Sequence, residues 1–296
     1  MTAGTDPAAS LRGIAFMVTG GALVTFSDAL LKLLTTVYDT GEILFLRGLF
    51  MGIPIAWLAW RAGGIATLRI RNPTLQILRA LLTTFATAVF FFALRYLPLA
   101  DTTAVNFAGP IFVAALAWPL LRERVEWRRW VAILLGFLGV IVMTRPSSET
   151  INWIAMLPAI GALGSALRDI ITRQMSTTET TMATLTFTSA FVALAGLVTL
   201  PFGWVMPSLE HLGLMAASGF LVGIAHFLFI EAFRLGEAAL IAPFRYVNLI
   251  WAILFGFLFW ADIPDAWMGI GSTLVIGSGL YLFHRQTRQS RAGVSG

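Results

Sequence analysis

The sequence predicts an all-α, polytopic membrane protein with ten transmembrane helices, arranged as two inverted five-helix repeats around a central cavity. Its composition is 58% hydrophobic and only 12% charged, whereas soluble domains are roughly 45–50% apolar and about 25% charged. The apolar runs each approach the ~20 residues that cross ~30 Å of hydrocarbon. In addition, polar motifs recur after about 140 residues. The first two observations predict the class, and the third predicts the repeat.

The spans are predicted from the apolar runs, and the short links between them are rich in glycine, proline and asparagine, which end helices. In chain order the spans cover 11–37, 41–60, 74–96, 100–121, 127–144, 151–173, 181–201, 209–234, 238–260 and 265–284. The predicted domains are a tail at 1–10, a first repeat at 11–146, a second repeat at 147–284 and a basic tail at 285–296.

An acid and a base four residues apart mark the repeat. Asp28 and Lys32 in the first span recur as Asp169 and Arg173 in the sixth, a shift of 141. Each half holds five spans, and because five is odd, the second half enters the membrane from the opposite side. Inverted halves of this kind are typical of secondary transporters that work by alternating access.

The arginines predict the orientation. Most of them fall at the N-terminus, at the C-terminus or in the links after even-numbered spans: Arg12, Arg61, Arg69, Arg71, Arg122, Arg124, Arg128, Arg129, Arg173, Arg234, Arg285, Arg288 and Arg291. The other side carries Arg95 and Arg145. By the positive-inside rule, both termini are expected in the cytoplasm. Arginines distributed by side, and not gathered in a stripe, also argue against a nucleic-acid partner.

Ionisable residues inside spans are costly to insert, so they are the first candidates for a site. They are Asp28, Lys32, Arg47, Arg79, Arg168, Asp169, His226, Glu231 and Arg245. Ser27 and Arg168 stand at matched positions beside the two aspartates, which favours polar patches facing inward from both halves.

Each of these residues also has a structural interpretation. Asp28 and Lys32 have the spacing of an ion pair on one helix face. Arg79 is close enough to the cytoplasmic interface for its guanidinium to reach water, and Arg47 has Asp39 and Glu42 as nearby acids. His226 is either a proton relay or a structural donor.

Two spans have broken, polar centres. Residues 242–251 contain Pro243, Arg245, Tyr246 and Asn248, and their counterpart at 104–110 contains Asn106, Phe107 and Pro110. A proline frees a backbone carbonyl of the preceding turn, which then needs another donor. We expect both segments to line the substrate path, with Pro110 and Pro243 as hinges; a kink satisfied by neighbouring helices is the alternative.

These residues predict a site for a zwitterion. A guanidinium binds a carboxylate, a carboxylate binds an ammonium, and aromatic rings accept an apolar side chain. The expected substrate-binding residues are Ser27, Asp28, Arg79, Asn106, Phe107, Arg168, Asp169, His226, Arg245, Tyr246 and Asn248.

No enzymatic motif is visible in the sequence. It has no cysteine, no zinc-binding histidine pair, no nucleophile elbow and no phosphate loop, so we expect no metal, no cofactor and no ATP hydrolysis. A lipid-modifying enzyme or a channel is less favoured, because the ionisable groups are spread through the depth and no filter sequence is present. Glycine pairs at 48 and 52 and at 219 and 223 suggest packing within a monomer or weak dimer.

The segment from Arg95 through Gly109-Pro110 to Arg122-Glu123 resembles the EamA repeat of the drug/metabolite transporter superfamily, and the segment from Arg234 to Asp262 resembles it again. This resemblance implies a ten-helix basket in a bacterial inner membrane that moves a small metabolite through the bilayer. Within the superfamily the chain looks similar to YddG-type exporters of aromatic and neutral amino acids. It resembles carriers of riboflavin or S-adenosylmethionine nearly as much.

Overall fold

The computed structural model is helical throughout its regular structure, with no strand in the residues it describes: 7–121, 127–144, 153–175, 178–235 and 242–292. The α-helices are α1 (Pro7–Lys32), α2 (Thr40–Arg61), α3 (Pro73–Leu94), α4 (Leu99–Asn106), α5 (Gly109–Leu121), α6 (Trp127–Thr144), α7 (Trp153–Met175), α8 (Thr181–Leu197), α9 (Leu209–Leu235), α11 (Val247–Trp260) and α12 (Ala266–Ala292). Short 3₁₀ turns are η1 (Gly64–Leu68), η2 (Leu200–Phe202) and η3 (Ala242–Tyr246).

Six helices of the described chain are long and apolar enough to cross a membrane by themselves: those in α1, α2, α3, α7, α8 and α9. Shorter apolar helices lie in α6, in the segment from η3 to α11, and in α12. The predicted fourth span is divided into α4 and α5, and the ninth into η3 and α11. Two boundaries differ from the prediction, because α1 begins inside the expected N-terminal tail and α12 continues through most of the expected C-terminal tail.

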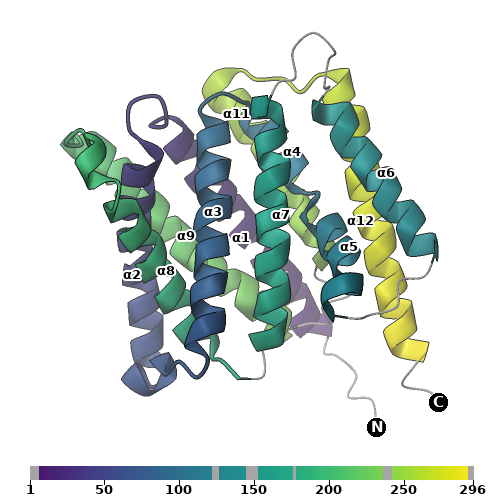
Figure 1. Ribbon diagram of the computed structural model, residues 1–296, viewed down its shortest axis with the longest axis horizontal. Coiled ribbons are helices and arrows are strands. Elements are labelled where there is room, and N and C mark those ends of the chain that lie inside the picture. Colours follow the sequence, from purple (N-terminus) through teal and green to yellow (C-terminus); the bar gives the residue numbers. More distant parts are fainter. Residues whose placement is uncertain (1–6, 122–126, 145–152, 176–177, 236–241, 293–296) are drawn as a thin grey trace.

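The helices run roughly antiparallel in one bundle, and both termini lie at the same end (Figure 1). We call this end the terminus side and the other end the opposite side. The links at 62–72 and 178–180 are on the terminus side, and those at 33–39 and 261–265 are on the opposite side. The helices of the two halves interleave, with α1 packing on α9, α2 on α8 and α9, α3 on α7, and α6 on α12.

Two helix starts on the terminus side carry side-chain caps. Asn72 accepts a hydrogen bond from the backbone N–H of Leu75, with Pro73 at the first position of α3. Thr180 caps α8 in the same way through Ala183. Such caps satisfy backbone donors that the first turn leaves without a partner, so these two ends are fixed locally by sequence.

Glycines allow the closest helix crossings. A Cβ at Gly219 would lie 2.7 Å from the backbone oxygen of Arg47, and one at Gly48 would lie 2.9 Å from the backbone nitrogen of Ala193. Gly223 likewise faces α2, while Gly52 has nothing within 4 Å. Three of the four expected small-residue positions therefore serve packing inside the chain.

Candidate functional site

A cavity of about 370 Å³ opens among α1, α3, α7, α8, α9 and η3. This lies within the roughly 300–1,000 Å³ range of small-molecule sites. Its lining is Met17, Arg79, Thr172, Met175, Glu179, Thr180, Thr181, Thr184, Leu185, His226, Phe229 and Arg245. Because Glu179 and Thr180 belong to the link at 178–180, the cavity reaches the terminus side.

Arg79 is the best-anchored charge of the cavity. Its Nε donates to Thr172 Oγ1 at 2.7 Å, and its Nη1 donates to Thr188 Oγ1 at 2.6 Å. Each threonine hydroxyl donates a hydrogen bond to a backbone carbonyl of its own helix. The lone pairs of the hydroxyl oxygen therefore accept from Arg79. Within the described chain, no carboxylate lies at ion-pair distance from Arg79. The interpretation that this side chain reaches water at the cytoplasmic interface stays a prediction, since Arg79 is partly exposed in a cavity that reaches the terminus side.

His226 and Arg245 complete the charged and polar part of the lining. Nδ1 of His226 lies 2.8 Å from the carbonyl oxygen of Val222, one turn earlier on α9. A carbonyl can only accept, so Nδ1 carries the proton and, in the neutral ring, Nε2 is an acceptor. Arg245 comes from η3 and is exposed. The sequence predicted Arg79, His226 and Arg245 in one site, and the structure places all three in the lining of one cavity.

Glu179 sits at the mouth of the cavity. It accepts hydrogen bonds from the backbone N–H groups of Arg71 and Asn72, at 2.8 and 2.6 Å, and from the amide of Gln76 at 3.3 Å. Desolvation pushes the pKa of Glu179 up, but these bonds and the charge of Arg71 outweigh it and hold the pKa below its ordinary value. The link between α7 and α8 is thus tied to the start of α3.

A second polar cluster is sealed in the opposite half of the bundle. Arg47 Nη2 donates to Asp28 Oδ1 at 2.8 Å and to Ser27 Oγ at 3.3 Å. The Ser27 hydroxyl lies 2.7 Å from that of Ser218 on α9. Both serines are fully buried and Arg47 is 9% exposed, so Ser27 and Asp28 do not line the cavity.

Two expected charge partners are therefore corrected. Asp28 pairs with Arg47 and not with Lys32, and Arg47 does not pair with Asp39 or Glu42. Lys32 instead reaches Asp262 at 3.5 Å and lies 4.5 Å over the ring of Trp260. These partners come from another helix or from the link at 261–265, which spacing along one helix cannot predict.

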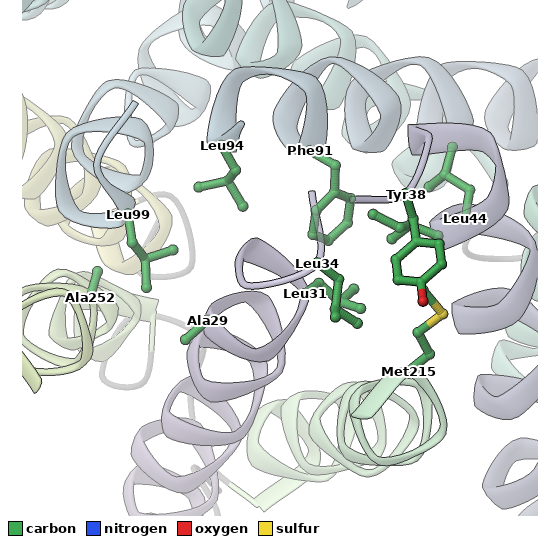
Figure 2. Close-up of a cluster of buried hydrophobic side chains, with 11 residues drawn as sticks. Ala29, Leu31, Leu34, Tyr38, Leu44, Phe91, Leu94, Leu99, Met215 and Ala252 are labelled. Atoms are coloured by element: carbon green, nitrogen blue, oxygen red, sulfur yellow. The ribbon is translucent and has the colours of Figure 1, made fainter. Parts of the chain in front are cut away.

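An apolar plug closes the opposite side next to this cluster (Figure 2). We define it as Ala29, Leu31, Leu34, Tyr38, Ile43, Leu44, Phe91, Leu94, Leu99, Met215 and Ala252. The guanidinium of Arg47 lies 4.7 Å from the Phe91 ring centroid. The ion pair and the plug thus form one continuous seal.

The broken centres meet each other. Phe107 follows α4 and packs edge to face on Tyr246 of η3, with centroids 5.3 Å apart. Asn248 packs against Gly21 of α1, and Asn106 is half-buried at the end of α4. Pro110 and Pro243 lie in α5 and η3, with side chains outside the described part. Of those with described side chains, Asn106, Phe107, Tyr246 and Asn248, none is in the cavity lining.

Arg168 and Asp169 pair with each other on α7, through Nε and Nη2 of Arg168 at 2.9 and 2.7 Å from Oδ1 of Asp169. They lie about one turn before Thr172, which contacts Arg79. The sequence analysis missed the threonines and Glu179, since uncharged or link residues carry no insertion penalty that would single them out. The repeat itself held one signal: Thr188 lies 141 residues after Arg47.

In the described chain, no group of three or more histidine, cysteine, aspartate or glutamate residues has the arrangement of a metal site. The chemistry of the cavity is instead that of two guanidinium groups, several hydroxyls and an imidazole, with the Glu179 carboxylate at the mouth already accepting from Arg71, Asn72 and Gln76. Such a donor-rich lining suits an anionic group on a small ligand.

Comparison with known proteins agrees with this geometry. Residues 11–145 match the EamA-like transporter family. The chain is similar to the S-adenosylmethionine uptake transporter of Rickettsia prowazekii, 26% identical over 94% of both chains. The pseudopaline exporter CntI of Pseudomonas aeruginosa is 28% identical over 86% of this chain and 90% of its own length. A riboflavin transporter of Rhizobium johnstonii is 26% identical over 77% of this chain and 76% of its own length.

A solved crystal structure also superposes on the chain, with a TM-score of 0.65 at 20% identity, covering 94% of this chain and 98% of the other. The two share a fold. The expected resemblance to the EamA repeat is confirmed, and the comparisons support a multi-pass membrane transporter of small metabolites and not an enzyme.

Proposed function

We propose that this chain, whose residues 11–145 belong to the EamA-like transporter family, is a secondary carrier for a small metabolite with an α-amino-carboxylate head. It works by alternating access in a bacterial inner membrane, with both termini in the cytoplasm. The observation that carries the proposal is Arg79, a guanidinium in the cavity that contacts two hydroxyls and no described acid.

The packing supports ten spans in two inverted repeats. If the halves are related by a two-fold axis in the membrane plane, each contact between spans must have a mate five spans away. The contact of α1 with α9 has its mate in that of α7 with α3, and the contact of α2 with α9 in that of α8 with α3. The contact of α1 with α11 corresponds to those of α7 with α4 and α5. The pairs α2–α8, α6–α12 and α4–α11 are their own mates.

The amino-carboxylate head follows from the lining. Arg79 and Arg245 offer a carboxylate charge-assisted hydrogen bonds. Nε2 of His226 and the threonine hydroxyls offer acceptors to an ammonium. Met17, Met175, Leu185 and Phe229 give an apolar wall to the rest of the ligand.

Neutral and aromatic amino acids, moved outward, are the first candidates. S-adenosylmethionine is the second, because it carries the same head and because transporters of that name match 94% of the chain. Riboflavin has no carboxylate, so Arg79 does not favour it.

The test is flux into and out of proteoliposomes with labelled phenylalanine, threonine, methionine and S-adenosylmethionine, together with thermal-shift measurements on the same compounds and riboflavin. We expect one head-bearing compound to be moved above the level of empty vesicles, and Arg79→Gln to abolish that flux. Protection by riboflavin alone, with flux unaffected by Arg79→Gln, would reject the proposed substrate class. A Tyr96→Phe variant is the matched control, since Tyr96 is exposed and on the opposite side.

A further inference from the structure

The two polar clusters occupy matched positions of the repeat. Asp28 corresponds to Asp169 and Arg47 to Thr188, both at a shift of 141, and Arg79 corresponds to Ser218 at a shift of 139. We call Ser27, Asp28, Arg47 and Ser218 the first half-site, and Arg168, Asp169, Thr188 and Arg79 the second half-site. Each half-site contains an aspartate from the first span of its repeat and hydroxyl and guanidinium groups from the neighbouring spans.

The half-sites differ in how the guanidinium is paired. In the first, Arg47 is 2.8 Å from Asp28, and their side chains are only 10% and 16% exposed. In the second, Arg79 has only threonine hydroxyls, while Asp169 is turned to its neighbour Arg168 and its side chain is 44% exposed. The Arg47 guanidinium is thus paired with an acid, whereas the Arg79 guanidinium is able to bind an acidic group of a ligand.

The surroundings of the half-sites differ in the same sense. Four residues of the apolar plug correspond, at a shift of 141, to residues that line the cavity. In order, Leu31, Leu34, Tyr38 and Leu44 are matched by Thr172, Met175, Glu179 and Leu185. Apolar side chains therefore fill the bundle at the first set of positions, whereas the equivalent positions line a cavity.

A buried donor marks the sealed half-site as incomplete. Nε of Arg47 is buried and has no hydrogen-bond acceptor, although an unsatisfied polar group in a low-dielectric interior is costly. Arg79 uses the same atom to bind Thr172. Nε of Arg47 lacks an acceptor while its half-site is closed. A ligand that enters when the opposite side opens is able to supply this acceptor.

We propose, resting on the alternating-access function, that Arg47 and Arg79 exchange roles as the ligand-facing guanidinium. In the present state Asp28 holds Arg47 and Arg79 faces the cavity. In the opposite state Asp169 leaves Arg168 and holds Arg79, while Asp28 releases Arg47 to a cavity that forms where the plug now lies.

The physical reason is the cost of an unpaired charge away from water. A guanidinium exposed to an open cavity is paired by water or by the ligand carboxylate, but once its side closes it needs an internal acid. Asp169 is placed for this, since it lies about one turn from Thr172, which Arg79 already contacts. Each aspartate therefore stabilises closure of its own half-site.

Single-cysteine labelling tests this exchange, and the chain has no native cysteine to interfere. Ala252→Cys reports on the plug, where the residue is now fully buried, and Thr184→Cys reports on the cavity. Labelling rates with a bulky polar maleimide are measured without substrate, so the result does not depend on which compound is carried.

Asp28→Asn removes the acid that closes the plug side. It is expected to raise labelling at position 252 by on the order of tenfold and to lower labelling at 184. Asp169→Asn is expected to shift the balance the other way, with labelling at 252 at or below the parent level and labelling at 184 at or above it. If both variants change labelling in the same direction, or if Asp28→Asn leaves 252 protected, the exchange is refuted.

A second variant guards against misfolding caused by the unpaired Arg47. Asp28→Asn with Arg47→Gln removes both charges and should fold, and because no unpaired guanidinium is left when the plug side closes, labelling at 252 is expected to return to the parent level. Opposite labelling changes without any flux of the tested compounds would uphold the exchange and reject the proposed substrates. Normal flux with unchanged labelling would refute the exchange and uphold the proposed substrates.

Discussion

Phe107 and Tyr246, which stand 139 residues apart at equivalent positions of the proposed repeat, meet with their ring planes at 70°. Each lies where its span is interrupted, Phe107 between α4 and α5 and Tyr246 between η3 and α11. The two interruptions thus support each other through one aromatic contact. This suggests a pivot shared by the halves.

The contact should be measurable as a coupling energy. Phe107→Ala, Tyr246→Ala and the double variant, unfolded in mixed detergent micelles, should show a coupling of about 0.5–1.5 kcal/mol. Tyr246→Phe keeps the ring and should retain the coupling. Additivity of the two alanine substitutions within about 0.3 kcal/mol would show that the rings are independent.

Arg79→Gln should weaken binding of the transported compound at least tenfold, because truncating one partner of a desolvated charge pair costs roughly 2–5 kcal/mol. Arg79→Lys should also lose affinity, since an ammonium does not reproduce the planar fork that spans two threonines. Titration calorimetry on the purified protein measures both effects. Arg61→Gln, at an exposed position, controls for net charge, and an equal loss there would assign the effect to long-range electrostatics.

Replacing His226 with asparagine or with glutamine tests the roles of its two ring nitrogens separately. Asparagine can keep the donor to Val222 but lacks a group at the Nε2 position, whereas glutamine reaches that position. Affinity for an amino-acid substrate should therefore be lower in His226→Asn than in His226→Gln. A deaminated carboxylate analogue should bind both variants alike; a preference with that analogue too would argue against ammonium recognition.

Glu179 should make stability fall in acid. Its folded-state pKa is lower than its ordinary value, so the native state is favoured above about pH 4.5 and loses this contribution as pH falls through the lowered pKa. The midpoint of thermal unfolding, followed from pH 6 to 3, should drop more in the parent than in Glu179→Gln. Parallel curves would show that the carboxylate charge does not hold the link.

Two glycines of α9 form a matched pair, since Gly219 lies at a close helix crossing and Gly213 has open space around it. Gly219→Ala places a Cβ 2.7 Å from the backbone oxygen of Arg47 and should destabilise by roughly 1–3 kcal/mol through overpacking. Gly213 has nothing within 4 Å, so Gly213→Ala should be neutral or slightly stabilising. Denaturant unfolding of both variants checks this. Equal changes in the free energy of unfolding would show that α9 does not pack closely on α2 at Gly219.

The helices were largely predictable, because an apolar run that must satisfy its own backbone can only be a helix in lipid. The interruptions near Pro110 and Pro243 were predictable for the same local reason. Helix ends outside the apolar runs were less so, as the extension of α12 shows, since polar residues such as Gln286 and Gln289 also suit a helix.

The partners of the charges were not predictable. Lys32 lies one turn from Asp28 in sequence yet pairs with Asp262, 230 residues away. Arg47 reaches Asp28 because α1 and α2 both pack on α9, which brings the two side chains together. The choice between acids at similar separations depends on which faces of the helices meet, and an amphipathic pattern does not reveal this when every face is apolar.

The interleaved packing has a consequence for how the chain is made. The serine hydroxyls that join α1 to α9 are 191 residues apart, and α1, α2 and α3 each have their main partners in the second half of the chain. During synthesis the first helices must wait in the bilayer, with Asp28 and Arg47 already inserted, until the later ones arrive. Because α1 and α2 both pack on α9, the arrangement that pairs Asp28 with Arg47 is completed only when α9 has been inserted.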